Sequence, residues 1–161
     1  MTFEHNLLQL GRISSPARLW SFAINVGTVA GFQSAIYACP PPHKKPTDPD
    51  TIVRYRGMSD AEFQKFAVDG LIGQGHLTNA NSLINAKPCR WTDLAELTSD
   101  KSEFLNLKAE ANSVGIDDGW IFPLFGPRGR DGLASFGKPN HPDLMTNEVG
   151  EKLQIFAQMS H

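Results

Sequence analysis

Residues 115–138, GIDDGWIFPLFGPRGRDGLASFGK, place the strongest constraint on how this 161-residue chain can fold. Residues 120–125 form an apolar run that contains one proline, and residues 133–136 form a second apolar run. The segment between them is rich in glycine and charge, which predicts a β-hairpin with a connection longer than two residues. Because neighbouring positions of the first run are both apolar, we expect helices on both faces of the sheet. Gly115 predicts the end of a helix just before the hairpin.

The composition is that of an ordinary globular chain. With 15 basic and 17 acidic side chains, it lacks the basic surface expected of a chain that binds nucleic acid by itself. No apolar run approaches the roughly 20 residues of a membrane span, and the N-terminus does not resemble a signal peptide. Cys39 and Cys89 form no Cys-x-x-Cys pair, which predicts free thiols in a reducing cytoplasm. We therefore expect one cytoplasmic domain over residues 1–161.

The first half of the chain predicts one helix and two strands. Ser15 and Pro16 are typical of the N-cap and first position of a helix, which should end near Gly31. Residues 33–38 form the first predicted strand, and residues 51–56 should pair with it in an antiparallel direction after a proline-rich loop.

The middle of the chain is predicted to be mostly helical. Ser59 and Glu62 have the spacing of a capping box, which should begin a helix that ends at Gly70. Further helices are expected over residues 78–86 and 100–114. Apolar residues at helical spacing after the hairpin predict a closing helix: Met145, Val149, Leu153, Phe156 and Met159. This order of elements predicts an α+β fold, an α-β-α sandwich with a central antiparallel sheet of about five strands.

The hairpin also carries a resemblance to a known family. Its glycines, prolines and neighbouring residues lie at offsets that resemble the ligand-binding domain of LuxR-type quorum-sensing regulators, which bind acyl-homoserine lactones: Gly119, Pro123, Leu124, Gly126, Pro127, Arg128, Gly129, Gly132, Ser135 and Phe136. The predicted order of elements resembles this family over nearly the whole chain. The resemblance implies a small-molecule ligand between the sheet and the middle helices, and no other cofactor.

The resemblance also implies a set of ligand contacts. Trp91 is similar to the tryptophan that closes over the lactone ring in the family. His76, fifteen residues earlier, occupies the place where the family usually has an aspartate that accepts the ligand amide N–H, and Thr78 fits a polar contact. Phe63 and Ala67 occupy the positions of a helix-borne tryptophan and tyrosine.

Further predicted contacts come from the hairpin and its neighbours. Ser135 falls where many members have a small hydroxyl residue, and Ile121 should face the same cavity. Tyr55, Phe66 and Phe104 complete the predicted set. Each residue also has a purely structural interpretation: Trp91 as a core residue, His76 as a surface or capping residue, the phenylalanines as core, and Ser135 as a small residue on a crowded sheet face.

Alternatives to ligand sensing have weaker support in the sequence. Ser135 with His141 and Asp131 or Asp143 supplies the residue types of a serine hydrolase. A nucleophile elbow, however, needs glycine two positions before the serine, where this chain has Leu133. The hairpin glycines precede no helix that would complete a phosphate site. Cys39 and His43 have no partner at metal-ligand spacing, so no metal is expected.

The family resemblance finally implies how the domain would act. LuxR-type regulators dimerise and pass their output to a C-terminal helix-turn-helix region. The sequence reaches His161 in or just after the predicted closing helix, so we expect that region to be absent from this chain. Either the chain is part of a longer regulator, or it is a free-standing domain that modulates a full-length relative by heterodimerising.

Overall fold

A computed structural model describes residues 2–44, 48–65, 87–93 and 101–161. Within these residues one antiparallel sheet has the strand order β2-β1-β5-β4-β3. The strands are β1 (Phe32–Cys39), β2 (Ile52–Arg56), β3 (Cys89–Arg90), β4 (Gly119–Leu124) and β5 (Gly132–Pro139).

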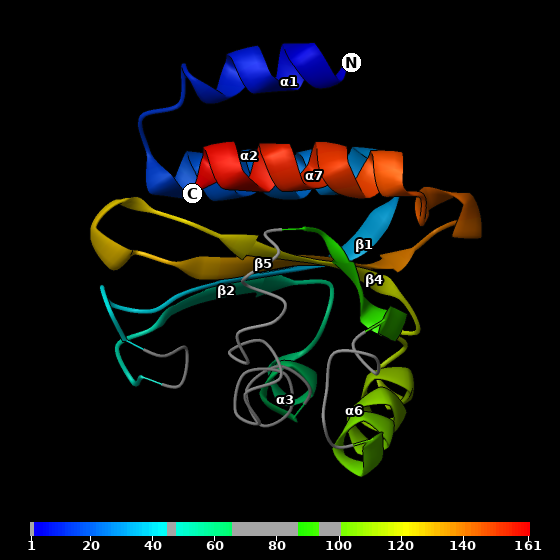
Figure 1. The fold of residues 1–161 in the computed structure, drawn as a ribbon. Helices are drawn as coiled ribbons and strands as arrows, with labels where there is room; N and C mark the ends of the chain where they lie inside the picture. The colour runs from blue at the N-terminus through cyan, green and yellow to red at the C-terminus, as the bar shows by residue number, and fades with distance from the viewer. Residues whose placement is uncertain (1, 45–47, 66–86, 94–100) are drawn as a thin grey trace.

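Helices cover both faces of this sheet (Figure 1). Helices α2 (Pro16–Val29) and α7 (Asn147–Ser160) lie over one face, and α1 (Phe3–Leu10) lies outside them. Helices α3 (Asp60–Phe63) and α6 (Lys101–Ser113) lie on the opposite side. This arrangement confirms the predicted α-β-α sandwich. No helix in the described ranges is long and apolar enough to cross a membrane.

The predicted hairpin is formed by β4 and β5. Trp120 pairs with Phe136 and Leu124 with Gly132, and the connection contains a 3₁₀ turn over Pro127–Gly129. All six residues of β4 are buried, as the apolar character of both its faces predicted. A Cβ atom on Gly132 would lie only 2.7 Å from the carbonyl oxygen of Ala38, so the close approach of β1 to β5 requires glycine there.

Helices α2 and α7 approach the sheet closely because each presents a glycine to it. A Cβ atom on Gly27 would lie 2.5 Å from the Phe136 ring, and one on Gly150 would lie 2.9 Å from the Trp120 ring. The two aromatic side chains are 5% and 2% exposed, respectively. The core on this face is therefore built from helix glycines against sheet aromatics.

Other predicted elements agree with the structure where it describes them. The Ser59 hydroxyl accepts from the Glu62 N–H at 3.2 Å, and the Glu62 carboxylate accepts from the Ser59 N–H at 2.7 Å, which confirms the capping box. Helix α6 ends two residues before Gly115, whose φ is 75°. The predicted helix end at Gly70 and the predicted helix over residues 78–86 lie outside the described residues.

Two residues of the predicted apolar patterns are exposed. Phe125 lies after β4 and is 43% exposed, and its N–H and C=O groups bond to the side-chain amide of Gln158. Helix α7 buries Gly150, Leu153, Phe156 and Ala157, whereas Met159, in its last turn, is 59% exposed.

Candidate ligand-binding site

The sheet face toward α3 and α6 carries the predicted ligand contacts. Strand alternation directs Ile36 of β1, Ile121 of β4 and Leu133 of β5 to this face, where they form one buried cluster with Phe63 and Trp91. The central strand β5 pairs with both β1 and β4, which brings these three strands together. The site therefore rests on the three inner strands of the sheet.

Tyr55 and Phe63 form a stacked aromatic pair at one side of this cluster. Their ring centroids are 3.9 Å apart and the ring planes differ by 5°. The capping box at Ser59 starts α3 and so places Phe63 against β2. The Tyr55 hydroxyl donates to the Asp60 carboxylate, and this bond raises the pKa of Tyr55. Its proton is therefore engaged within the protein, while its oxygen can still accept a hydrogen bond.

Trp91 lies deep in the same cluster with 2% of its surface exposed. It begins a 3₁₀ turn, Trp91–Asp93, directly after β3. Pairing of Arg90 with Trp120 across β3 and β4 fixes the backbone before it. The Arg90 guanidinium also forms an ion pair with Asp118, which precedes β4. The edge of the sheet thus holds Trp91 in place by backbone pairing and by one ion pair.

A small cavity separates Trp91 from the sheet. Its described volume is about 10 Å³, enough for about one water molecule. Its polar groups include the hydroxyls of Ser34 and Ser135, and Ile36, Ile116 and Ile121 contribute apolar walls. The space between the described residues alone is therefore too small for an acyl chain, but it offers neutral polar groups beside aromatic and aliphatic surface.

The structure brings half of the predicted contacts together. Their role in ligand binding stays a prediction. Tyr55, Phe63 and Trp91 meet in the cluster with Ile121, and Ser135 borders the same cavity as Trp91. The remaining predicted contacts lie outside the described residues or have side chains that do: Phe66, Ala67, His76, Thr78 and, on α6, Phe104.

Ser34, Ile36 and Ile116 were not predicted to border the site. Ile36 pairs directly with Ser135, so Ser34 and Ile36 point to the same face as Ser135. The sequence predicted a strand over residues 33–38, but it did not indicate that this strand lies beside the hairpin. Ile116 follows the end of α6, where its N–H bonds back to the Ala111 carbonyl, as expected for a glycine-terminated helix.

A larger cavity of about 340 Å³ lies on the opposite face of the sheet, between α2, α7 and the strands. Trp20, Tyr37 and Arg54 are among its lining residues. The cavity of about 340 Å³ and the predicted ligand contacts therefore lie on different faces of the sheet. The family resemblance concerns the α3 and α6 face.

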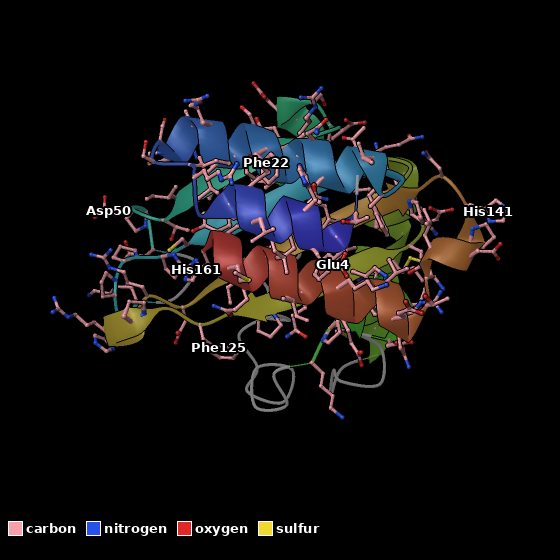
Figure 2. The ribbon with its side chains drawn as sticks, turned by 90° about the horizontal axis from the view of Figure 1, so that it is seen from above. Glu4, Phe22, Asp50, Phe125, His141 and His161 are labelled. Atoms are coloured by element: carbon pink, nitrogen blue, oxygen red, sulfur yellow. The ribbon has the colours of Figure 1, made fainter. Side chains whose placement is uncertain are left out.

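The residue types of a serine hydrolase are not assembled around Ser135. The described residues that line its cavity include no histidine and no acidic residue. His141 lies in the exposed turn before α7, with its Nδ1 atom 3.1 Å from the Asp143 carboxylate (Figure 2). Within the described ranges, no three His, Cys, Asp or Glu side chains group closely enough to hold a metal ion.

The two cysteines are free thiols, as predicted. Burial, reinforced by the negative charge of Asp93, raises the pKa of Cys89 to about 11. The thiol of Cys89 is therefore protonated at neutral pH and is a poor nucleophile.

Solved structures with a similar fold come from bacterial transcription regulators. The crystal structure of Escherichia coli SdiA superposes with a TM-score of 0.76 at 16% identity, covering 98% of this chain and 64% of that one. The solution structure of E. coli SdiA residues 1–171 has a TM-score of 0.70 at 18% identity, covering 98% and 89%. CepR2 from Burkholderia cenocepacia, described as an N-acylhomoserine lactone-dependent LuxR family transcription factor, has a TM-score of 0.61 at 14% identity, covering 98% and 88%.

At these identities the structures establish the fold, and this chain spans about 64% of the SdiA chain in the crystal. No curated protein sequence matches this chain significantly. The sequence model of the family described as "Autoinducer binding domain" matches residues 15–161. Since that match covers nearly the whole sequence, the chain belongs to the autoinducer-binding domain family of LuxR-type quorum-sensing regulators.

Proposed function

We propose that this chain is the sensory domain of a LuxR-type transcriptional regulator and binds an acyl-homoserine lactone, or a related small amphipathic signal, on the α3 and α6 face of the sheet. The observation that carries this proposal is the grouping of Trp91 with the stacked Tyr55 and Phe63 rings in one cluster, with Ser34 and Ser135 beside Trp91. Ligand sites in proteins commonly combine such apolar walls with a few placed polar groups.

The similar structures support an acylated ligand. One structure is E. coli SdiA in complex with octanoyl-rac-glycerol, at a TM-score of 0.66 and 14% identity, covering 98% of this chain and 64% of that one. That ligand joins an aliphatic chain to a neutral polar head. The Ser34 and Ser135 hydroxyls offer donors and acceptors to such a head, while the surrounding aromatic and aliphatic side chains suit its chain.

We further propose that plain acyl-homoserine lactones bind this chain more weakly than they bind typical family members. His76 replaces an ionised aspartate as the acceptor for the amide N–H, Phe63 lacks an indole N–H, and Ala67 lacks a phenol hydroxyl. At about 0.5–1.5 kcal/mol for each ordinary hydrogen bond, and more for the charged one, the deficit is roughly 2–4 kcal/mol. This corresponds to a thirty-fold to thousand-fold loss of affinity.

Calorimetry on the wild type and on a His76→Asp, Phe63→Trp, Ala67→Tyr variant tests this head-group assignment. The variant is expected to bind N-octanoyl-homoserine lactone at least thirty-fold more tightly, because three polar contacts are restored. A Trp91→Phe variant should weaken binding in both backgrounds. Nanomolar binding by the wild type, with no gain in the triple variant, would show that these positions do not contact the head group.

The output of the domain is also a proposal. We propose that it acts on DNA through a further region, either on the same polypeptide or on a full-length relative with which it pairs, and that it works in a reducing cytoplasm. The balance of 15 basic and 17 acidic side chains supports a separate DNA-binding region. Ile155 and Met159 of α7 are 49% and 59% exposed, which supports self-association through that helix. The absence of an acid or a histidine from the described lining of the Ser135 cavity supports binding rather than catalysis.

A further inference from the structure

The cavity on the α2 and α7 face has the features of a separate ligand site. Its volume of about 340 Å³ falls within the range of small-molecule pockets, roughly 300–1,000 Å³. It lies between α2, the end of α7 and strands β1 and β2, across the sheet from Trp91. Figure 2 places His161, at the end of α7, at the same end of the molecule as Asp50, which precedes β2.

The cavity exists because the helices do not fully cover the edge strand β2. Arg54 pairs with Tyr37 and Ile52 with Cys39, so Arg54 and Ile52 point to the same face as Tyr37. Ile52 is 57% exposed, and Arg54 is exposed as well. The side chains of β2 on this face therefore form an open wall beside the packed core under α2 and α7.

The accessible wall of the cavity is apolar. Leu19, Trp20 and Ala23 of α2 are partly buried and Ile52 is 57% exposed, whereas Leu124 and Phe156 are 0% exposed and offer no surface to a ligand. The Trp20 ring centroid lies 6.5 Å from that of Tyr37. Such a wall favours an aliphatic chain over a polar ligand.

The rim of the cavity is polar and positively charged. Arg54 forms no ion pair with any described residue, and no Asp or Glu occurs among the described lining residues. The Tyr37 hydroxyl lies 3.1 Å from Nδ1 of His161, and burial raises the pKa of Tyr37, so the phenol stays protonated. The Ser15 hydroxyl makes no capping bond in α2 and also lines the cavity. The rim thus combines one unpaired cation with neutral hydroxyl groups.

We propose that this cavity binds a small amphipathic carboxylate: a single aliphatic chain that lies against Leu19, Trp20 and Ile52, and a carboxylate head that pairs with Arg54. The guanidinium group suits a carboxylate because it can donate two parallel hydrogen bonds. A neutral head would leave that cation without a partner. This site does not rest on the proposed function, because it uses the other face of the sheet.

Calorimetry with decanoate at low salt tests the site, with decanol as the uncharged match. Arg54→Gln is compared with Arg56→Gln, a variant on the same strand and face whose side chain does not line the cavity. Decanoate affinity should fall about three- to tenfold in Arg54→Gln, since one charge-assisted contact at an exposed position is lost. It should not change in Arg56→Gln, and decanol should bind the wild type and Arg54→Gln equally.

Two further variants test which face of the sheet binds decanoate. Ala23→Leu, which fills the cavity from α2, should abolish decanoate binding, and Trp91→Phe should leave it unchanged. The proposal is overturned if the wild type does not bind decanoate or if the two arginine variants bind it equally. It is also overturned if Trp91→Phe abolishes binding while Ala23→Leu does not. N-octanoyl-homoserine lactone binding by Ala23→Leu reports on the proposed function separately.

Discussion

The two faces of the sheet are built from the same strands but packed in different ways. Toward α2 and α7, strand β4 presents Trp120, Phe122 and Leu124, none more than 2% exposed, and helix glycines bring the backbone close to them. Toward α3 and α6, the hairpin presents Ile121 and Ser135, and a small cavity remains beside Trp91. At the hairpin, large aromatic residues face α2 and α7, whereas Ile121 and Ser135 face Trp91 on the other side.

Within one hairpin, the residues that face α2 and α7 should contribute mainly to stability, and the residues that face Trp91 should contribute mainly to ligand binding. The aromatic residues of β4 bury the largest apolar area and should contribute most of its stabilising energy. On the opposite face the hairpin presents smaller side chains and the Ser135 hydroxyl. Substitutions at neighbouring positions of one strand should therefore have different consequences.

The largest expected effect compares Phe122→Ala with Ile121→Ala. Phe122 is fully buried, so its truncation should cost about 3–5 kcal/mol of unfolding free energy. Ile121→Ala should cost about 2–3 kcal/mol, because fewer buried atoms are removed, and it should also weaken ligand binding. Urea unfolding and calorimetry on both variants measure this. Equal stability losses, or a loss of lactone affinity in Phe122→Ala alone, would contradict the division between the faces.

Alkaline pH should lower the unfolding free energy through one partly buried acidic group on each face. Burial raises the pKa of Cys89, on the cavity side, to about 11, and raises the pKa of Tyr37, on the α2 side. Both groups keep their protons when folded at a pH where the unfolded chain loses them. Stability present at neutral pH should thus fall as the pH rises from about 8.5 to 11, by on the order of 2 kcal/mol for Cys89.

Urea unfolding at a series of pH values measures this loss. Cys89→Ser should flatten the curve between about pH 8.5 and 11, and Tyr37→Phe should flatten it only above about pH 10. A wild-type unfolding free energy that stays level to pH 11 would show that burial does not raise the pKa of these groups. A pH dependence that neither variant changes would show the same.

A smaller effect is expected from glycine substitutions. Gly150→Ala puts a Cβ atom 2.9 Å from the buried Trp120 ring. Overpacking of this kind costs about 1–3 kcal/mol and should outweigh the gain of roughly 1 kcal/mol in helix propensity. Gly11→Ala is the control, because its Cβ would meet only the Leu8 carbonyl, at 3.9 Å. Thermal unfolding should show a lower midpoint for Gly150→Ala and little change for Gly11→Ala.

Local sequence signals predicted most of the described elements. Turn glycines gave the hairpin, Ser15-Pro16 gave the start of α2, and the Ser59 capping box gave the start of α3. The sequence analysis missed α1, although Phe3, Leu7 and Leu10 recur at helical spacing and pack in one cluster with Phe156. It also missed β3, since a two-residue strand has no periodicity to detect.

The site was only partly predictable because it depends on contacts between distant segments. Trp91, Ser135 and Ile121 followed from the family resemblance. The pairing of Ile36 with Ser135 joins segments about 100 positions apart, and no local pattern encodes such a pairing. The α2-side cavity depends on how far α2 extends over β2, which also lies beyond local patterns.

The most direct test of the account is the shift in unfolding midpoint that N-octanoyl-homoserine lactone causes in two cavity-filling variants. Ser135→Leu fills the cavity beside Trp91, and Ala23→Leu fills the cavity under α2. At a hundredfold excess over its dissociation constant, the ligand should stabilise the wild type by about 2.7 kcal/mol, or roughly 5–10 °C. The account predicts that this shift is lost in Ser135→Leu and kept in Ala23→Leu. A shift that survives in Ser135→Leu but disappears in Ala23→Leu would place the signal on the other face and contradict it.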